Sequence, residues 1–306
     1  VLALDGIVCF GQVSYSPYLL AHCAENGVTI SHLTETGRFQ ARIQGPTTGN
    51  VLLRRTQYRW ADDLERTTAL ARAFVLGKLH NGRVVYRRAG RDADGSARKE
   101  GLTAAADRLG DLVAKAEHVE SADAARGVEG EAGASYWQDF PLLVSRNAEG
   151  FIFGGRSRRP PLDRVNCLLS FLYTVLAHDI RSALETVGLD PYVGFLHRDR
   201  PGRPSLALDM MEEFRPWLVD RLVLSLINRG QVRPAGFVSE ETGGYLMDDD
   251  TRRAVLTAWQ ERKQEVVTHP FLNEKMPVGL LWHTQALLLA RHLRGDLEAY
   301  PPVFWR

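Results

Sequence analysis

The sequence predicts an α+β protein, with a small N-terminal β domain over residues 1–57 and a larger all-α domain over residues 58–306. Two observations predict this fold class. Short runs typical of strands, separated by turn residues, occupy the first 55 residues, and from about Trp60 onward apolar residues recur at helical spacing. With 306 residues, of which 44% are hydrophobic and 25% charged, the chain is long enough to bury a sizeable core.

The N-terminal domain is predicted to be a strand, a short helix and two further strands. The strand-like runs are "GIVCF" (6–10), "GVTISHL" (27–33) and "GRFQARI" (37–43). The third run alternates apolar and polar residues, which is the period of a half-buried strand. Between the first two runs, "SPYLLAHCAENG" has Ser16 before a proline, which suits a helix start, and Gly27, which suits a helix end.

The second domain is predicted to be helical throughout. Helical spacing and strong helix formers cover residues 60–80, 103–127, 163–187, about 209–228 and about 280–293. The helix over 163–187 has the strongest signals, because Asp163 suits its N-cap and Gly188 its end, with one continuous apolar face between them. The polar, glycine-containing stretch "RAGRDADGSARKEG" (88–101) is the best candidate for a linker.

Composition excludes several classes of protein. No window holds the eighteen or so uninterrupted apolar residues of a membrane span, and no basic segment followed by an apolar one precedes the first strand, so we expect neither a span nor an export signal. The three cysteines, Cys9, Cys23 and Cys167, have no paired spacing, which argues against a zinc site or a disulfide framework and for a reducing, cytoplasmic compartment.

Arginine dominates the basic residues, with 33 Arg against 5 Lys, although the net charge is only +1. The arginines cluster at 87–91, 156–159 and 198–203. A guanidinium group binds phosphate through a planar fork, so such clusters on one face would hold a polyanion despite overall neutrality. The alternative is an arginine-rich composition whose clusters are solvated surface.

One segment places a carboxylate among glycines. In "RGVEGEAGASYW", Glu129 lies between Gly127 and Gly130, and if the segment is helical these glycines form, with Ala134, a strip of small residues that lets another element pack tightly. The alternative is a glycine-rich loop that leaves Glu129 in water.

A second segment, "GFLHRDRPGRPSLALDMMEEFRP" (194–216), carries His197 twelve residues ahead of a cluster of acids, in a helix that Pro216 interrupts. Helical spacing puts Asp209, Glu212 and Glu213 near one helix edge. Acids in a first turn also suit the helix dipole, and a loop histidine can lie at the surface, so spacing alone leaves both interpretations open.

Taken together, one histidine and two or three carboxylates suit manganese or magnesium rather than structural zinc. Such a metal polarises a phosphodiester and stabilises the oxyanions of an in-line displacement, so the chemistry needs no covalent protein nucleophile. The neighbouring Arg198, Arg200 and Arg203 would then grip the phosphates.

Several longer motifs are more specific than these spacings. They are "FGQVS" (10–14), "GNVLLRRTQY" (49–58), "RGVEGEAGASYW" (126–137), "RSRRPPLDRVNCLLSFLYTVL" (156–176) and "GLDPYVGFLHRDRPGRPSLALDMMEEFRPWLVDRLVLSLINRGQV" (188–232). In this order, and over nearly the whole chain, the sequence closely resembles the CRISPR-associated adaptation integrases, the Cas-one family, of the type I-C kind. Relative to that family, we expect the chain to lack the first few dozen residues.

The resemblance implies a small β domain that makes a homodimer and a helical domain that holds one divalent metal, manganese or magnesium. The metal-binding glutamate of the family falls on Glu129, its histidine on His197 and its third ligand on Glu212, while Asp209 matches a neighbouring acid that shapes the site. Glu213 is then expected to be ordinary helix surface. One difference is Gly133, where many members carry alanine or a bulkier residue, which is expected to loosen the helix.

The implied activity is insertion of short foreign DNA into the CRISPR array, by attack of a 3′-hydroxyl on a phosphodiester at the repeat boundary. The family works as two homodimers bridged by a dimer of the small Cas-two protein. The residues expected to contact the double-stranded DNA are Arg156, Arg158, Arg159, Arg198, Arg200, Arg203 and Tyr136. Two alternatives remain open: a metal nuclease that hydrolyses branched or linear DNA in repair, and a non-catalytic helical scaffold that binds DNA.

Overall fold

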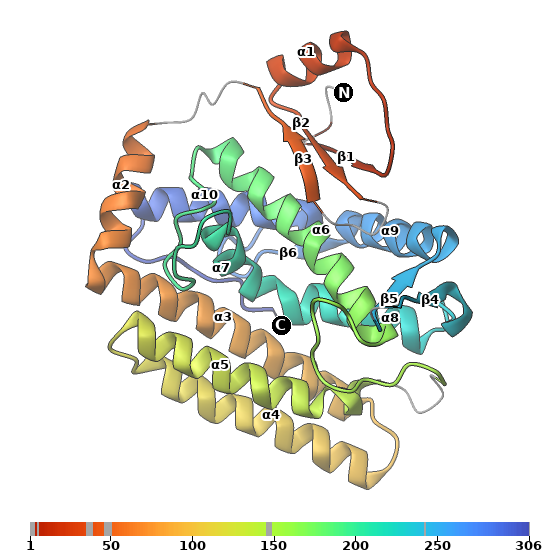
Figure 1. Cartoon of the computed structure of the whole chain (residues 1–306). Coiled ribbons are helices and arrows are strands. Elements are labelled where there is room, and N and C mark those ends of the chain that lie inside the picture. The colour runs from red at the N-terminus through yellow and green to blue at the C-terminus, as the bar shows by residue number, and fades with distance from the viewer. Residues whose placement is uncertain are drawn as a thin grey trace.

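A computed structural model of the chain describes residue 4 and residues 6–34, 39–45, 51–144, 149–241 and 243–305. Its N-terminal part is a three-stranded sheet with one helix (Figure 1), and it contains the strands β1 (Gly6–Phe10), β2 (Thr29–Leu33) and β3 (Phe39–Ile43) and the helix α1 (Pro17–Glu25). Strand β2 is central, parallel to β1 with Gly6 opposite Thr29 and antiparallel to β3. The side chain of Phe39 lies outside the described part. The predicted strands are confirmed.

Local signals set the bounds of α1. Ser16 caps its start by accepting the backbone N–H of Leu19 at 3.2 Å, and Gly27 follows its end with a φ of +69°, a conformation that favours glycine. The sheet and α1 enclose a small core of Cys9, Cys23, Val28 and Ile30.

Three long helices form one layer at the bottom of Figure 1: α3 (Leu64–Arg91), α4 (Ser96–Glu117) and α5 (Ala122–Asp139). Helix α2 (Val51–Asp62) precedes them, and Asp63 caps the start of α3 by accepting two backbone N–H groups. The linker expected over 88–101 is only the short turn at 92–95, because α3 continues to Arg91. The predicted boundary at 57/58 falls inside α2, whose Gln57 is fully buried and donates to the carbonyls of Asp190 and Val193 in the helical part.

Helix α6 (Arg164–Val187) crosses the middle of the molecule. Asp163 caps it by accepting the N–H of Asn166 at 2.7 Å, and Gly188 ends it in the left-handed region, as predicted. Within the described part of the chain, α6 is the one helix long and apolar enough to cross a membrane. Of its most apolar stretch of 18 residues, 56% is buried inside the fold, as in a core helix.

The helix expected over 209–228 is three helical pieces in sequence. They are α7 (Ser205–Phe214), a wider π-helical turn (Arg215–Asp220) and α8 (Arg221–Asn228). Pro216 is the cause, because it lacks a backbone N–H and its ring clashes with the carbonyl four residues earlier, so regular α-helical bonding stops there.

The C-terminal third adds elements that the sequence did not predict. They are the hairpin of β4 (Phe237–Ser239) and β5 (Tyr245–Met247), α9 (Asp249–Gln264) and the hairpin of β6 (Val266–Thr268) and β7 (Lys275–Pro277). Short 3-10 turns also occur at Phe140–Leu143, Pro234–Gly236 and Val278–Leu280. Helix α10 (Leu281–Arg294) is the last element, and each of its ends lies one residue from the predicted end. It packs against α6 and α2.

A candidate metal centre below an arginine-lined cleft

Glu129 lies in the middle of α5, so the segment is a helix and the glycine-rich loop is excluded. The expectation that its glycines allow close packing was wrong. A Cβ atom added at Gly127, Gly130 or Gly133 would have no neighbour within 4 Å. The glycines therefore leave open space beside α5, and the Glu129 side chain, 28% exposed, forms an ion pair with Lys78.

Asp209, fully buried near the start of α7, organises the loop that carries His197. Its carboxylate accepts the backbone N–H groups of Phe195, Leu196 and His197 at 2.7, 2.9 and 2.9 Å. Gly194 permits this approach, because a Cβ there would lie 2.7 Å from Asp209 Oδ2.

The same carboxylate also fixes the imidazole of His197, whose Nδ1 lies 2.7 Å from Asp209 Oδ1. A buried carboxylate between several donors accepts, so Nδ1 carries the hydrogen and Nε2 keeps its lone pair. A carboxylate behind a histidine in this way is the usual support of a metal-binding imidazole.

Glu212 lies on α7 with a side chain only 1% exposed, between two cations. Lys78 Nζ is 2.8 Å from Oε2, and Arg215 lies 3.1 Å from Oε1. Burial alone would raise the pKa of this carboxyl, but Arg215 and Lys78, helped by His197, lower it to about 2. Glu212 is therefore a carboxylate at every physiological pH.

Lys78 on α3 was missed from the sequence, yet it joins the predicted residues. Its ammonium group forms ion pairs with both Glu129 and Glu212, which lie 83 residues apart in the sequence. One signal was available: Lys78 is one of only five lysines in an arginine-rich chain, and it lies in the mostly apolar run "AFVLGKL" (73–79).

The structure thus brings Glu129 and Glu212 together around Lys78, and it places His197 close enough to Glu212 to help lower the pKa of that carboxyl. Within the described ranges, no three His, Cys, Asp or Glu side chains lie in a metal-ligating arrangement, and the cation between the two glutamates is the lysine ammonium. The donor set still fits a hard divalent cation. Glu212 Oε2 is buried and lies 2.8 Å from the Lys78 ammonium, without a hydrogen bond of regular geometry. A divalent cation bound to the two glutamates would take the place of that ammonium.

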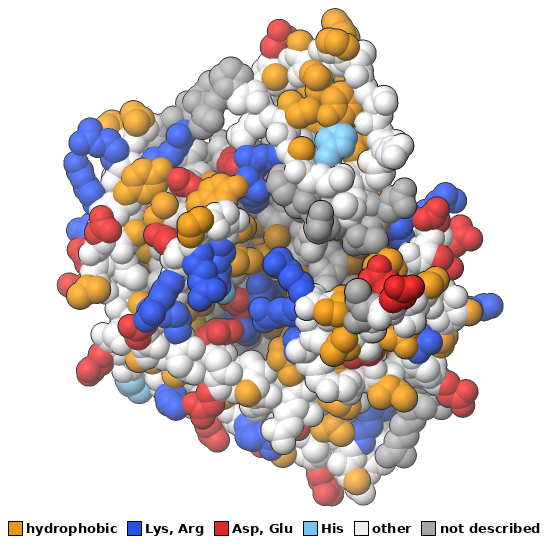
Figure 2. All heavy atoms as spheres, in the orientation of Figure 1, with side chains coloured by type: hydrophobic (Ala, Val, Ile, Leu, Met, Phe, Trp, Pro, Cys, Tyr) orange, Lys and Arg blue, Asp and Glu red, His pale blue; other side chains and the backbone are white. Residues whose placement is uncertain are grey.

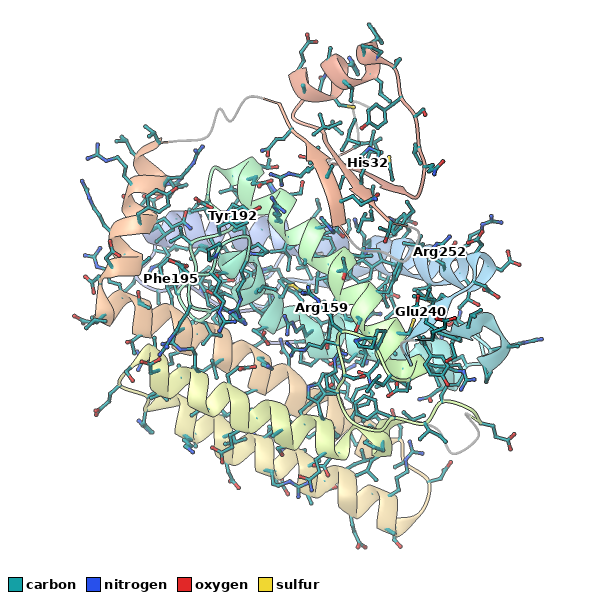
Figure 3. The ribbon with its side chains drawn as sticks, in the orientation of Figure 1. His32, Arg159, Tyr192, Phe195, Glu240 and Arg252 are labelled. Carbon is teal, nitrogen blue, oxygen red and sulfur yellow. The ribbon has the colours of Figure 1, made fainter. Side chains whose placement is uncertain are left out.

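Arginine side chains surround this site. Figure 2 shows Lys and Arg side chains gathered around a hollow in the middle of the visible face. Arg203, from the loop before α7, has its pKa lowered by partial burial and by the positive charges of Arg200, Arg158 and Arg215. Arginines of two predicted clusters, around 156–159 and 198–203, therefore lie close enough for their charges to interact with one another and with Arg215. Figure 3 labels one residue of each loop, Arg159 near the middle of the view and Phe195 to its left.

Arg156 is a correction among the expected DNA-binding arginines. Its guanidinium is largely buried, donates to Asn166 Oδ1 at 2.7 Å and to Ser170 Oγ, and lies 5.4 Å from the ring centre of Tyr173. These contacts hold the loop before α6 and engage the guanidinium with groups of the fold itself. Arg198 is exposed, but it pairs with Asp123 at 2.6 Å.

Tyr136 and Glu213 are two further corrections, because each was expected at a surface and is buried. Tyr136 is 7% exposed and donates to Asp220 Oδ2 at 2.9 Å, so it lines no DNA groove. Tyr173 donates to the other oxygen of Asp220, and burial raises the pKa of this aspartate to about 6. Glu213 is fully buried and accepts from the C-terminal segment. Both side chains fill the interior behind the site.

Comparison with known proteins agrees with the motif resemblance. The family model described as CRISPR associated protein Cas1 matches residues 1–261. A CRISPR-associated endonuclease Cas1 of Chlorobaculum tepidum is 57% identical over 99% of this chain and 88% of its own length, and one of Rhodospirillum rubrum is 54% identical over the same shares.

Two solved structures have the same fold at lower identity. A casposase bound to integration product has a TM-score of 0.83 at 23% identity, with 99% of this chain and 82% of that chain covered. A CAS1 protein from Thermotoga maritima has a TM-score of 0.82 at 24% identity, with 97% of this chain and 88% of that chain covered.

Proposed function

Because the chain belongs to the Cas1 family of CRISPR-associated endonucleases and integrases, we propose that it inserts short DNA fragments into the CRISPR array with one divalent metal ion held by Glu129, His197 and Glu212. The observation that carries this proposal is the convergence of the two glutamates on Lys78, with the His197 imidazole beside Glu212 and oriented by Asp209.

The proposed ligands are carboxylate oxygens of Glu129 and Glu212 and the Nε2 nitrogen of His197. When bound there, a manganese or magnesium ion would supply Lewis-acid stabilisation of charge on the phosphodiester oxygens. The residues of the chain do the rest. Asp209 orients the imidazole, and Lys78 and Arg215 keep Glu212 ionised and add positive charge where the pentacovalent phosphate becomes more negative.

The proposed substrate is double-stranded DNA with a free 3′-hydroxyl, which attacks a phosphodiester at the repeat boundary. Arg158, Arg200 and Arg203 are proposed to contact its backbone, since they line the approach to Arg215 and none pairs with a carboxylate in the described part of the chain. Arg159 and Arg198 are proposed at the rim of the same cleft.

Alanine variants of Glu129, His197 and Glu212 test the assignment, with Glu131→Ala as matched control. Glu131 is on the same helix, but its side chain is 54% exposed and pairs with Lys115 away from the site. We expect each of the three variants to lose Mn²⁺ binding by calorimetry and strand transfer of a short duplex into a repeat-bearing plasmid. The control should retain both. Retention of both activities by the three variants would exclude this site.

The same assay separates the two alternatives. Cleavage without joining of a 3′-hydroxyl end, even with the small partner present, would indicate a hydrolytic nuclease, and no Mn²⁺ binding by the wild type would indicate a non-catalytic DNA-binding scaffold.

We also propose that the protein is of the type I-C kind, cytoplasmic, and active as homodimers bridged by a Cas2 dimer. The motif order shared with that subtype supports the first, and light scattering of the mixture with Cas2 tests the last.

A further inference from the structure

We infer that the C-terminal segment Tyr300–Trp305 is a brace that positions Glu212, acting through its neighbour Glu213 and through Asn81 of α3. This inference rests on the proposed function, since it assigns positioning residues to the metal site. It is carried by a set of buried hydrogen bonds that join four parts of the chain behind α7. Figure 1 shows the C-terminal end near the middle of the view, among the helices.

Glu213 is the centre of this set. Its Oε1 accepts the hydroxyl of Tyr300, and its Oε2 accepts the backbone N–H of Val303 at 2.7 Å and Nε2 of Gln285 at 3.1 Å. All four side chains are at most 4% exposed. A carboxylate that is buried away from water needs hydrogen-bond donors from the protein, and here three donors hold Glu213 in one position.

Asn81 completes the connection to α3. Its Nδ2 donates to the backbone carbonyls of Glu213 and Val303, both at 2.7 Å, and its Oδ1 accepts the N–H of Trp305 at 2.8 Å. Asn81 lies one turn after Lys78, on the same face of α3. The same two turns of α3 therefore hold Glu212 through an ion pair and Glu213 through its backbone.

Close packing supports these bonds. A Cβ at Gly77 would lie 3.2 Å from Pro302 and 3.4 Å from Glu213, so glycine lets α3, α7 and the brace meet. At the end of the brace, Trp305 stacks on Trp217 with 5.9 Å between ring centres, and the Arg88 guanidinium lies 4.0 Å from its ring centre. The segment is thus anchored at both ends.

Consecutive residues of a helix point about 100° apart, so Glu213 faces the brace while Glu212 faces the site. Fixing Glu213 fixes the rotation of α7 about its axis. A rotation of about 10° would move a side-chain tip about 6 Å from the axis by about 1 Å, which exceeds the tolerance of about 0.5 Å for an ordered site. Loss of the brace should therefore weaken metal binding although no ligand changes.

The test compares three variants. Glu213→Ala removes the acceptor, Glu213→Gln keeps an acceptor for Val303 and Gln285, and Leu102→Ala is a destabilised control in the core between α3 and α4. We expect Glu213→Ala to weaken Mn²⁺ binding at least tenfold by calorimetry. Glu213→Gln should recover affinity to within about threefold of wild type, and Leu102→Ala should stay within twofold while its melting temperature falls.

Hydrogen exchange of the α7 amides gives the second measurement. Protection of residues 205–214 should fall in Glu213→Ala and hold in Leu102→Ala. Wild-type affinity and unchanged α7 protection in Glu213→Ala would overturn the brace, as would an equal loss of affinity in Leu102→Ala. If wild type itself binds no Mn²⁺, the proposed metal site fails, and the α7 protection alone then decides whether the brace exists.

Discussion

Asp220 is expected to make the stability of the fold depend on pH. Its carboxyl is 1% exposed, and burial raises its pKa to about 6 from the ordinary aspartate value of 3.8. Hydrogen bonds from Tyr173 and Tyr136 and the charges of Arg156 and Arg215 act in the opposite direction. Since the folded-state pKa is the higher one, folding favours the protonated carboxyl. This stabilisation is complete below about pH 3.8 and is lost as the pH rises through about 6.

The difference between these pKa values corresponds to about 3 kcal/mol of folding free energy, of which about 2 kcal/mol falls between pH 4.5 and 7.5. Asp220→Asn keeps the size of the side chain and cannot ionise. We therefore expect the free energy of unfolding of the variant, relative to wild type, to increase by about 2 kcal/mol between those two pH values.

Urea denaturation followed by circular dichroism, at several pH values between 4.5 and 7.5, measures this difference. Asp249→Asn is the control, since its side chain is 82% exposed, and it should show no such trend. A difference between Asp220→Asn and wild type that stays constant with pH would refute the reasoning, because it would mean that folding does not change the ionisation of Asp220.

Three further predictions concern the site and its surroundings. Gly133→Ala should raise the free energy of unfolding by about 0.5–1 kcal/mol in urea titrations, because alanine favours the helix and its new methyl meets no atom within 4 Å. A loss of stability would contradict the open space along α5. Asp209→Ala should weaken Mn²⁺ binding about 10–100-fold by calorimetry, because His197 loses its orienting acceptor, and wild-type affinity would dismiss that role. Arg203→Ala should lower the salt dependence of DNA binding, measured by fluorescence anisotropy, by about one phosphate contact. Arg156→Ala should leave this salt dependence unchanged and lower the melting temperature, since the contacts of Arg156 are internal. The reverse pattern would exchange the two assignments.

Local signals in the sequence predicted the ends of α1 and α6, because the residues that set them are neighbours. Ser16 and Asp163 cap helices within three residues of themselves, and Gly27 and Gly188 end them through a backbone conformation that a side chain disfavours. The short hairpins escaped prediction because strands of three residues carry almost no periodic pattern. Helix α9 was also missed, although Asp248 caps its start by accepting the backbone N–H of Thr251.

The candidate site divides in the same way. The motif resemblance predicts Glu129, His197 and Glu212 as metal ligands, whereas spacing alone left each of them as a ligand or a surface residue. Only the folded chain joins Glu129 and Glu212 through Lys78, turns Glu213 inward and buries Tyr136. The sequence by itself therefore determined the family and the helices and strands that carry local signals. Tertiary structure decided which polar groups lose water and which charges meet, because those partners are far apart along the chain and burial depends on all that packs around them.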